Sequence, residues 1–134
     1  MKHQSRFYTV KNMQKLLVLA EAKIISVSPS YEYQDIAVKT PKQLRGVFIR
    51  FKNGVNLSVQ WGVGSYCDRG DSTCEIMAMN EKGDAICIPN HLSLRDYNQV
   101  IGHVDKDKLL LIMQECSKMV AKIRKDVGCS DGTE

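Results

Sequence analysis

The chain has 134 residues, of which 43% are hydrophobic and 25% are charged, and its formal net charge is +4. This length fits one domain that can bury a core, and the composition is ordinary for a globular protein. A charge of +4 makes a nucleic-acid-binding domain an unlikely interpretation, because such domains usually gather more positive charge on one face.

The chain shows no sign of secretion or of membrane insertion. The longest early apolar run, 16–20, is too short for a signal peptide or a membrane span. Five cysteines form no Cys-x-x-Cys pair, namely Cys67, Cys74, Cys87, Cys116 and Cys129. An odd number of cysteines without a secretory signal indicates reduced thiols. We therefore expect a cytoplasmic protein with no membrane partner.

A helix and two short strands are predicted first. Thr9 can cap a helix over 10–22, in which four apolar residues recur at helical spacing: Met13, Leu16, Leu17 and Ala20. The apolar runs 24–27 and 36–38 predict short strands, separated by the turn-forming segment Ser28-Pro29-Ser30.

The central segment RGVFIRFKNGVNLSVQWGVGSY, residues 45–66, predicts a β-hairpin whose register can be derived. A two-residue turn at Asn53-Gly54 would set each apolar row opposite polar partners. A three-residue loop instead places all apolar residues on one face, as burial requires, with the pairs Phe51–Val55, Ile49–Leu57 and Val47–Val59. This register predicts a left-handed Gly54 in a bulged turn.

A second hairpin and a long helix complete the predicted fold. A loop at 81–83 pairs Ala78 with Ile86 and Ile76 with Ile88, and a crossing loop follows, with a short strand near Val100. Asp105 caps a helix over 106–126 that ends before Gly128 and buries one stripe of residues: Leu109, Ile112, Met113, Cys116, Met119, Val120 and Ile123. We predict a single α+β domain over 1–128, with an antiparallel sheet of four to six strands built from two hairpins. An N-terminal and a C-terminal helix flank the sheet, and a disordered tail follows over 129–134.

Two surfaces are candidate binding sites. Arginines and aromatic residues around the Gly-x-Gly-x-Tyr loop would suit an anionic ligand that carries a base, and these candidates are Arg45, Arg50, Trp61, Gly62, Gly64, Tyr66 and Arg69. The opposing interpretation is a tight turn beside a solvated face, because no helix follows the glycines as a P-loop requires. The polar face of the hairpin could instead dock a protein partner, through Phe48, Arg50, Asn56, Ser58 and Gln60.

Metal binding and catalysis find little support. A zinc set of Cys67, Cys74, Cys87 and His91 lacks the tightly spaced ligand pairs of structural zinc sites, and cysteines at strand positions usually pack as small hydrophobes. No histidine lies in a recognisable nucleophile–base context, although the fold could bring one near a cysteine. We expect no cofactor and no metal, and a nucleotide hydrolase is the alternative that would need a catalytic constellation.

The segment over 45–84 resembles small uncharacterised proteins encoded by phages and prophages. The shared features are a Phe-x-Asn-Gly hairpin, a Ser-Val-Gln strand, a Gly-x-Gly-x-Tyr turn and a later strand that ends in an Asn-charged-Gly loop. The resemblance implies an accessory protein that acts by binding. One such class, the counter-defence sponges, sequesters nucleotide signals and is typically oligomeric. Other proteins encoded in the same phage gene neighbourhoods inhibit a host protein. We therefore expect a homo-oligomer that binds a small anionic ligand or, alternatively, a host factor.

Overall fold

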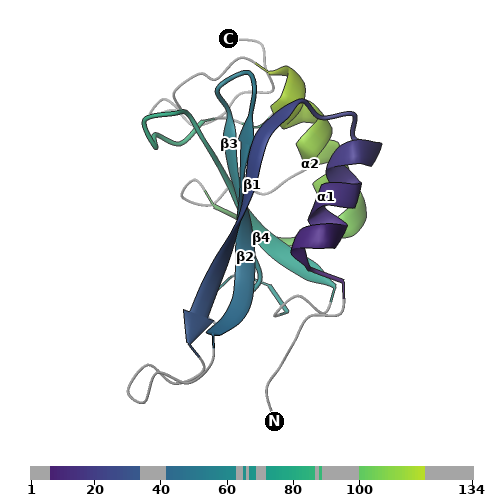
Figure 1. Ribbon diagram of the computed structural model, residues 1–134, viewed down its shortest axis with the longest axis vertical. Helices are drawn as coiled ribbons and strands as arrows, with labels where there is room; N and C mark the ends of the chain where they lie inside the picture. The colour runs from purple at the N-terminus through teal and green to yellow at the C-terminus, as the bar shows by residue number, and fades with distance from the viewer. Residues whose placement is uncertain are drawn as a thin grey trace.

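The computed structural model describes residues 7–33, 42–62, 65, 67–68, 72–86, 88 and 100–119. Two helices cover one face of a five-stranded antiparallel sheet with the strand order β1-β2-β3-β4-β5 (Figure 1). In chain order the elements are α1 (Val10–Leu19), β1 (Ile24–Tyr33), β2 (Lys42–Phe51), β3 (Asn56–Gln60), β4 (Thr73–Met79), β5 (Ile101–Asp105) and α2 (Lys106–Lys118). The predicted α+β class, with a helix near each end of the chain, is confirmed.

The register of the central hairpin is confirmed. Val47 lies opposite Val59 and Ile49 opposite Leu57, and the Phe51 N–H donates to the Val55 carbonyl at 2.9 Å. Gly54 has a φ of +91°, a left-handed conformation that glycine adopts without strain. Burial of one apolar face therefore decided the turn, in preference to the usual two-residue Asn-Gly turn.

The core lies between the sheet and the helices. Ile49, Leu57 and Ile76 from the sheet are fully buried with Leu109 and Met113 of α2. Tyr8, just before α1, is also buried, and its hydroxyl donates to the carbonyl oxygens of Ser72 (3.1 Å) and Val104 (3.4 Å). This side chain therefore ties the start of the chain to β5 and to the segment before β4.

Helix α1 begins where predicted and ends earlier. Thr9 Oγ1 accepts from the Asn12 N–H at 3.1 Å, so the N-cap is confirmed, and the four apolar residues predicted for one face are buried. The helix ends at Leu19 because Glu21 adopts a φ of +54° and the Ala22 N–H returns to the Leu17 carbonyl at 3.0 Å. This is a Schellman C-cap with glutamate where glycine is usual, so the sequence did not signal it.

Strand β1 runs straight through Ser28-Pro29-Ser30, so the prediction that these residues separate two strands is wrong. β1 is an edge strand, and Pro29 lies opposite Val47. A proline cannot donate to the ladder, so its nitrogen faces the free edge, where no neighbouring strand needs an N–H. The predicted strand over 36–38 lies outside the described residues.

The second hairpin forms at its turn but is shorter than predicted. Gly83 has a φ of +89°, and the Ile86 N–H donates to the Ala78 carbonyl at 3.0 Å, in agreement with the Ala78–Ile86 pair. Further along β4, however, Ile76 pairs with Ile101 of β5 and not with Ile88. The strand expected near Val100 is therefore β5.

Helix α2 begins at its predicted cap and ends before its predicted end. Asp105 Oδ1 accepts from the Lys108 N–H at 2.8 Å, and the stripe of buried residues from Leu109 to Cys116 is confirmed. The helix stops at Lys118, because Asn53 Nδ2 donates to the carbonyls of Cys116 (2.7 Å) and Met119 (2.8 Å). The predicted helical residues after Met119, and the predicted tail, lie outside the described residues.

Candidate functional site

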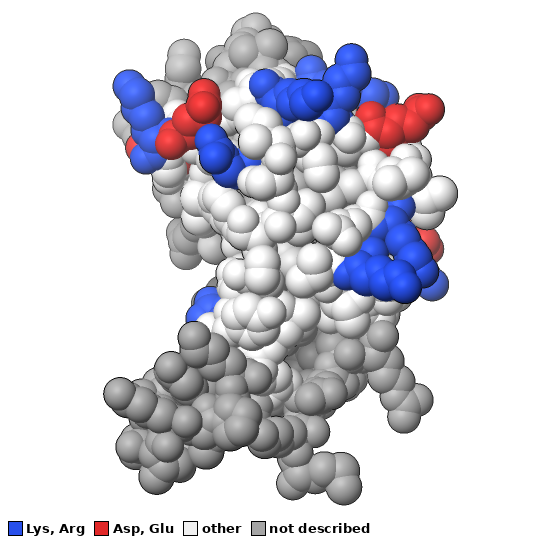
Figure 2. Space-filling model, in the orientation of Figure 1, with Lys and Arg blue, Asp and Glu red and all other residues white. Residues whose placement is uncertain are grey.

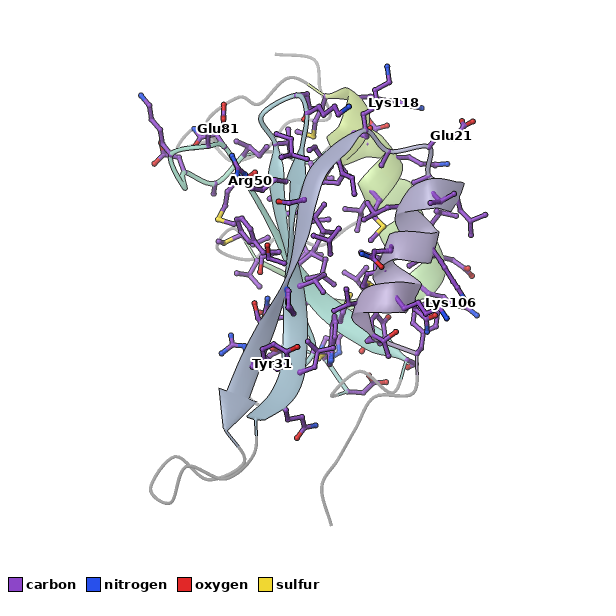
Figure 3. All side chains as sticks on the ribbon, viewed as in Figure 1. Glu21, Tyr31, Arg50, Glu81, Lys106 and Lys118 are labelled. Atoms are coloured by element: carbon purple, nitrogen blue, oxygen red, sulfur yellow. The ribbon has the colours of Figure 1, made fainter. Side chains whose placement is uncertain are left out.

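The side of the sheet away from the helices, here called the outer face, presents three rows of side chains across four strands. Arg50 is labelled on this side in Figure 3, where its side chain extends from the sheet away from both helices. The strand pairings define the rows as Ser26–Arg50–Asn56–Met79, Ser28–Phe48–Ser58–Met77 and Ser30–Gly46–Gln60–Glu75. The outer face is therefore mainly polar, with one aromatic ring in its middle row.

Hydrogen bonds fix three polar side chains at the open end of the hairpin. Arg45 Nε donates to Gln60 Oε1 at 3.0 Å, and Gln60 Nε2 donates to Ser58 Oγ at 3.1 Å. Arg45 is the extra residue where the β1–β2 register shifts, and it is exposed. Its Nε is held by Gln60, and among the described residues no partner holds its two terminal nitrogens. These nitrogens form a planar fork that suits a carboxylate or a phosphate.

Gly46 makes room for this relay. A Cβ atom at Gly46 would lie 2.6 Å from Gln60 Cδ and would also strike the Val59 carbonyl oxygen. The Gln60 side chain therefore lies flat over the Gly46 backbone, in the space that any other residue would fill. A glycine inside a predicted strand often marks such a close approach, so this was a readable signal in the sequence.

Phe48 occupies the centre of the outer face. It is half-buried and lies between the small residues Ser28 and Ser58 on the neighbouring strands. These two neighbours are short, and part of the Phe48 side chain remains exposed. Ser58 also ends the relay from Arg45, so the ring and the arginine belong to one continuous surface.

Arg50 lies at the other end of the outer face, beside the hairpin turn. It is exposed and pairs with Asn56, a buried residue whose Nδ2 donates to the Asn80 carbonyl at 3.4 Å. Arg45 and Arg50 are five residues apart on one strand, which corresponds to about 16 Å. The structure therefore does not bring the two predicted arginines into one small pocket.

Trp61 and Gly62 are buried and do not form part of an exposed ligand surface. Trp61 is only 3% exposed, and its ring centroid lies 5.4 Å from that of Tyr8. Gly62 is buried, and its N–H donates to the Arg45 carbonyl at 3.2 Å. This packing removes Trp61 from the candidate stacking residues. The other candidates in the loop, Gly64, Tyr66 and Arg69, lie outside the described residues.

An aspartate closes the loop that follows the hairpin. Asp68 Oδ1 accepts from the Thr73 N–H (2.9 Å), and both carboxylate oxygens accept from the Ser72 N–H (3.1 Å). Partial desolvation opposes ionisation, but the hydrogen bonds from Ser72 and Thr73 outweigh it and hold the pKa of Asp68 well below its usual range. Asp68 thus anchors this loop as an ionised carboxylate.

The described cysteines behave as packing residues. Burial raises the pKa of the Cys116 thiol to about 12 and raises that of Cys74 further, so both stay protonated at neutral pH. Cys67 is half-buried and packs against the core. Among the residues that the structure describes, no three histidine, cysteine, aspartate or glutamate side chains gather as metal ligands. Cys87 and His91, from the zinc set considered above, lie outside these residues.

No family model, curated protein or solved structure matches this chain. Within the described part of the chain, neither helix is long and apolar enough to cross a membrane. The candidate site is therefore argued from its own geometry.

Proposed function

We propose that this chain is a non-enzymatic binding protein that takes a small anionic ligand on the outer face of its sheet. The observation that carries the proposal is the exposed guanidinium of Arg45, which Gln60 holds through Nε. A preorganised arginine loses less side-chain entropy on binding than a free one, and its two terminal nitrogens can bind an oxyanion through two parallel hydrogen bonds.

The other surfaces of the sheet are less suited to binding. The helices cover the inner face (Figure 1). On the β1 edge, the nitrogen of Pro29 carries no hydrogen and cannot donate to an added strand. On the β5 edge, Gly102 and His103 form a bulge opposite Glu75, and His103 has a φ of +52°. Prolines and bulges protect sheet edges from strand addition. Figure 2 shows uncharged groups over the middle of the face that it presents, with charged groups above them and a Lys and Arg cluster on the right.

Docking of a host protein is the second candidate. It is favoured by Phe48, Met77, Met79 and Arg50 on one face, because aromatic residues, methionine and arginine are enriched in the centres of protein interfaces. The resemblance to phage-encoded proteins fits either candidate. On that basis we also propose an accessory, counter-defence role, a cytoplasmic location and a homo-oligomeric state.

The test is native mass spectrometry of the protein mixed with inorganic phosphate, citrate, ribose 5-phosphate and AMP. At least one anion should add its mass to the protein, and Arg45→Gln should weaken that binding by about tenfold or more, because it removes at least one charge-assisted hydrogen bond. Lys15→Gln, an exposed cation on α1, is the matched control and should not change binding. Absence of every anion from the wild-type protein, or full binding by Arg45→Gln, would overturn the proposal.

If the protein partner is the correct candidate, a Phe48→Glu variant that folds normally should lose its partner while wild-type protein binds no anion. A partner retained by Phe48→Glu would exclude docking through the outer face.

A further inference from the structure

We infer that the ligand of the outer face is a nucleotide, whose base stacks on Phe48 and whose phosphate binds Arg45. This inference rests on the function proposed above and names the class of ligand. It assigns the stacking part to Phe48, in place of Trp61, whose ring is buried against Tyr8.

The spacing of the two groups supports a ring and an anion held apart by a linker. Phe48 and Gly46 are two residues apart on one face of β2, which places their side-chain positions about 7 Å apart. Gln60 covers Gly46, and Arg45 Nε lies 3.0 Å from Gln60 Oε1. Arg45 is therefore anchored through Gln60, a residue of the row next to that of Phe48. A nucleoside phosphate, in which the sugar separates base and phosphate, fits this arrangement, whereas an anion attached directly to a ring does not.

The chemistry between the two groups is also suitable. Ser58 lies opposite Phe48 and accepts from Gln60, and its hydroxyl can still donate one hydrogen bond. Ser28, on the other side of Phe48, is exposed and can donate and accept. Sugar hydroxyls and base edges offer matching groups. Stacking on an aromatic ring tolerates any base, so this site selects the nucleotide class and not one base.

A nucleotide unit can come from a free nucleotide or from a single strand, and Arg50 distinguishes the two sources. It lies about 16 Å from Arg45 along the strand. Phe48 lies between the two arginines, about 7 Å from Arg50 along the strand, so a mononucleotide whose phosphate binds Arg45 places only its base near Arg50. A strand of several nucleotides would place a second phosphate there.

The experiment is isothermal titration calorimetry of the whole chain with three probes, namely adenosine, ribose 5-phosphate and AMP. AMP should bind more tightly than either fragment. Phe48→Leu should weaken the binding of AMP by about fivefold to a hundredfold, which is the usual loss of one base stack. It should leave the binding of ribose 5-phosphate unchanged. Arg45→Gln should weaken AMP and ribose 5-phosphate equally. Thermal unfolding of each variant checks that the fold is kept.

Lys15→Gln, which removes an exposed cation from α1, is the matched control. It should not change AMP binding. An eight-nucleotide single strand serves as the fourth probe. If it binds more tightly than AMP and loses affinity in Arg50→Gln, the source is a nucleic-acid strand. If it binds no better than AMP and is unaffected, the source is a free nucleotide.

The inference and the proposed function fail in different ways. If ribose 5-phosphate binds as tightly as AMP in an Arg45-dependent manner, and Phe48→Leu has no effect, the anion site stands and the nucleotide inference is overturned. If neither citrate nor any of the phosphates binds the wild-type protein in either experiment, both are overturned.

Discussion

The two faces of β2 differ in what fixes their side chains. Ile49 on the inner face is fully buried, and the surrounding apolar residues of the sheet and helices all require that orientation. Phe48, its neighbour on the outer face, is half-buried between two serines, and beside it a relay of single hydrogen bonds holds Arg45. Many packing contacts thus fix the side chains of the inner face, whereas only a few contacts fix those described here on the outer face. Substitutions on the inner face should affect folding first, and those on the outer face should affect binding first.

The largest expected effect separates the two faces directly. Ile49→Ala should lower the free energy of unfolding by about 2–5 kcal/mol, because it removes buried methyl groups and leaves a cavity. Phe48→Ala should cost less, since the ring is only half-buried and the cost follows the area taken from water. Urea unfolding of both variants measures the difference.

Val18→Ala, at a residue 77% exposed, is the control and should change the free energy of unfolding by less than about 0.5 kcal/mol. Equal losses for Phe48→Ala and Ile49→Ala would show that the outer face is as much a part of the folding core as the inner one.

A smaller effect is expected where the hairpin turn contacts the helical layer. Asn53→Ala should lower the free energy of unfolding by about 1–3 kcal/mol, because the Cys116 and Met119 carbonyls each lose a hydrogen bond and Val55 loses its bond to Asn53 Oδ1. Lys52→Ala, at an exposed residue of the same turn, is the control. If both variants unfold alike, the Asn53 bonds do not anchor α2, and its end at Lys118 needs another cause.

The inner face was the predictable part of this fold. Alternating apolar residues set the register of Val47, Ile49 and Phe51 against their partners, and the caps at Thr9 and Asp105 were correct because one side-chain oxygen near an N–H is a local feature. Pairing over a long separation was harder. Ile76 could pair with Ile88 or with Ile101 on pattern alone, and in the complete five-stranded sheet its partner is Ile101.

The candidate site was predictable as a surface and not as a geometry. The sequence indicated that Phe48, Ser58 and Gln60 share one polar face and named Arg45 as a ligand candidate, but nothing in it shows that Arg45 donates to Gln60 across a bulge. Trp61 illustrates the converse. An aromatic residue beside a glycine loop suits a ligand, and its burial follows from Tyr8, more than fifty residues earlier in the chain.

The smallest expected effect concerns the loop at the open end of the hairpin and depends on pH. The pKa of Asp68 is lower in the folded protein than in the unfolded chain, so its contribution to stability is present above the unfolded pKa of about 4 and is lost as the pH falls through the folded pKa. Asp68→Asn should therefore be less stable than wild type at pH 6–8, by less than about 1 kcal/mol because the carboxylate is exposed.

The deficit should shrink as the pH falls below about 4, where wild type loses the same contribution. Urea unfolding at a series of pH values measures it. Ser72→Ala is the control, since Ser72 donates to Asp68 through its N–H and its hydroxyl. This substitution should cost less in the Asp68→Asn background than in wild type, because the charged acceptor is gone. A deficit that stays constant from pH 7 to pH 3 would mean that the geometry of the Asp68 side chain, and not its charge, holds the loop. The stability of this loop would then be as insensitive to protonation as that of the buried inner face.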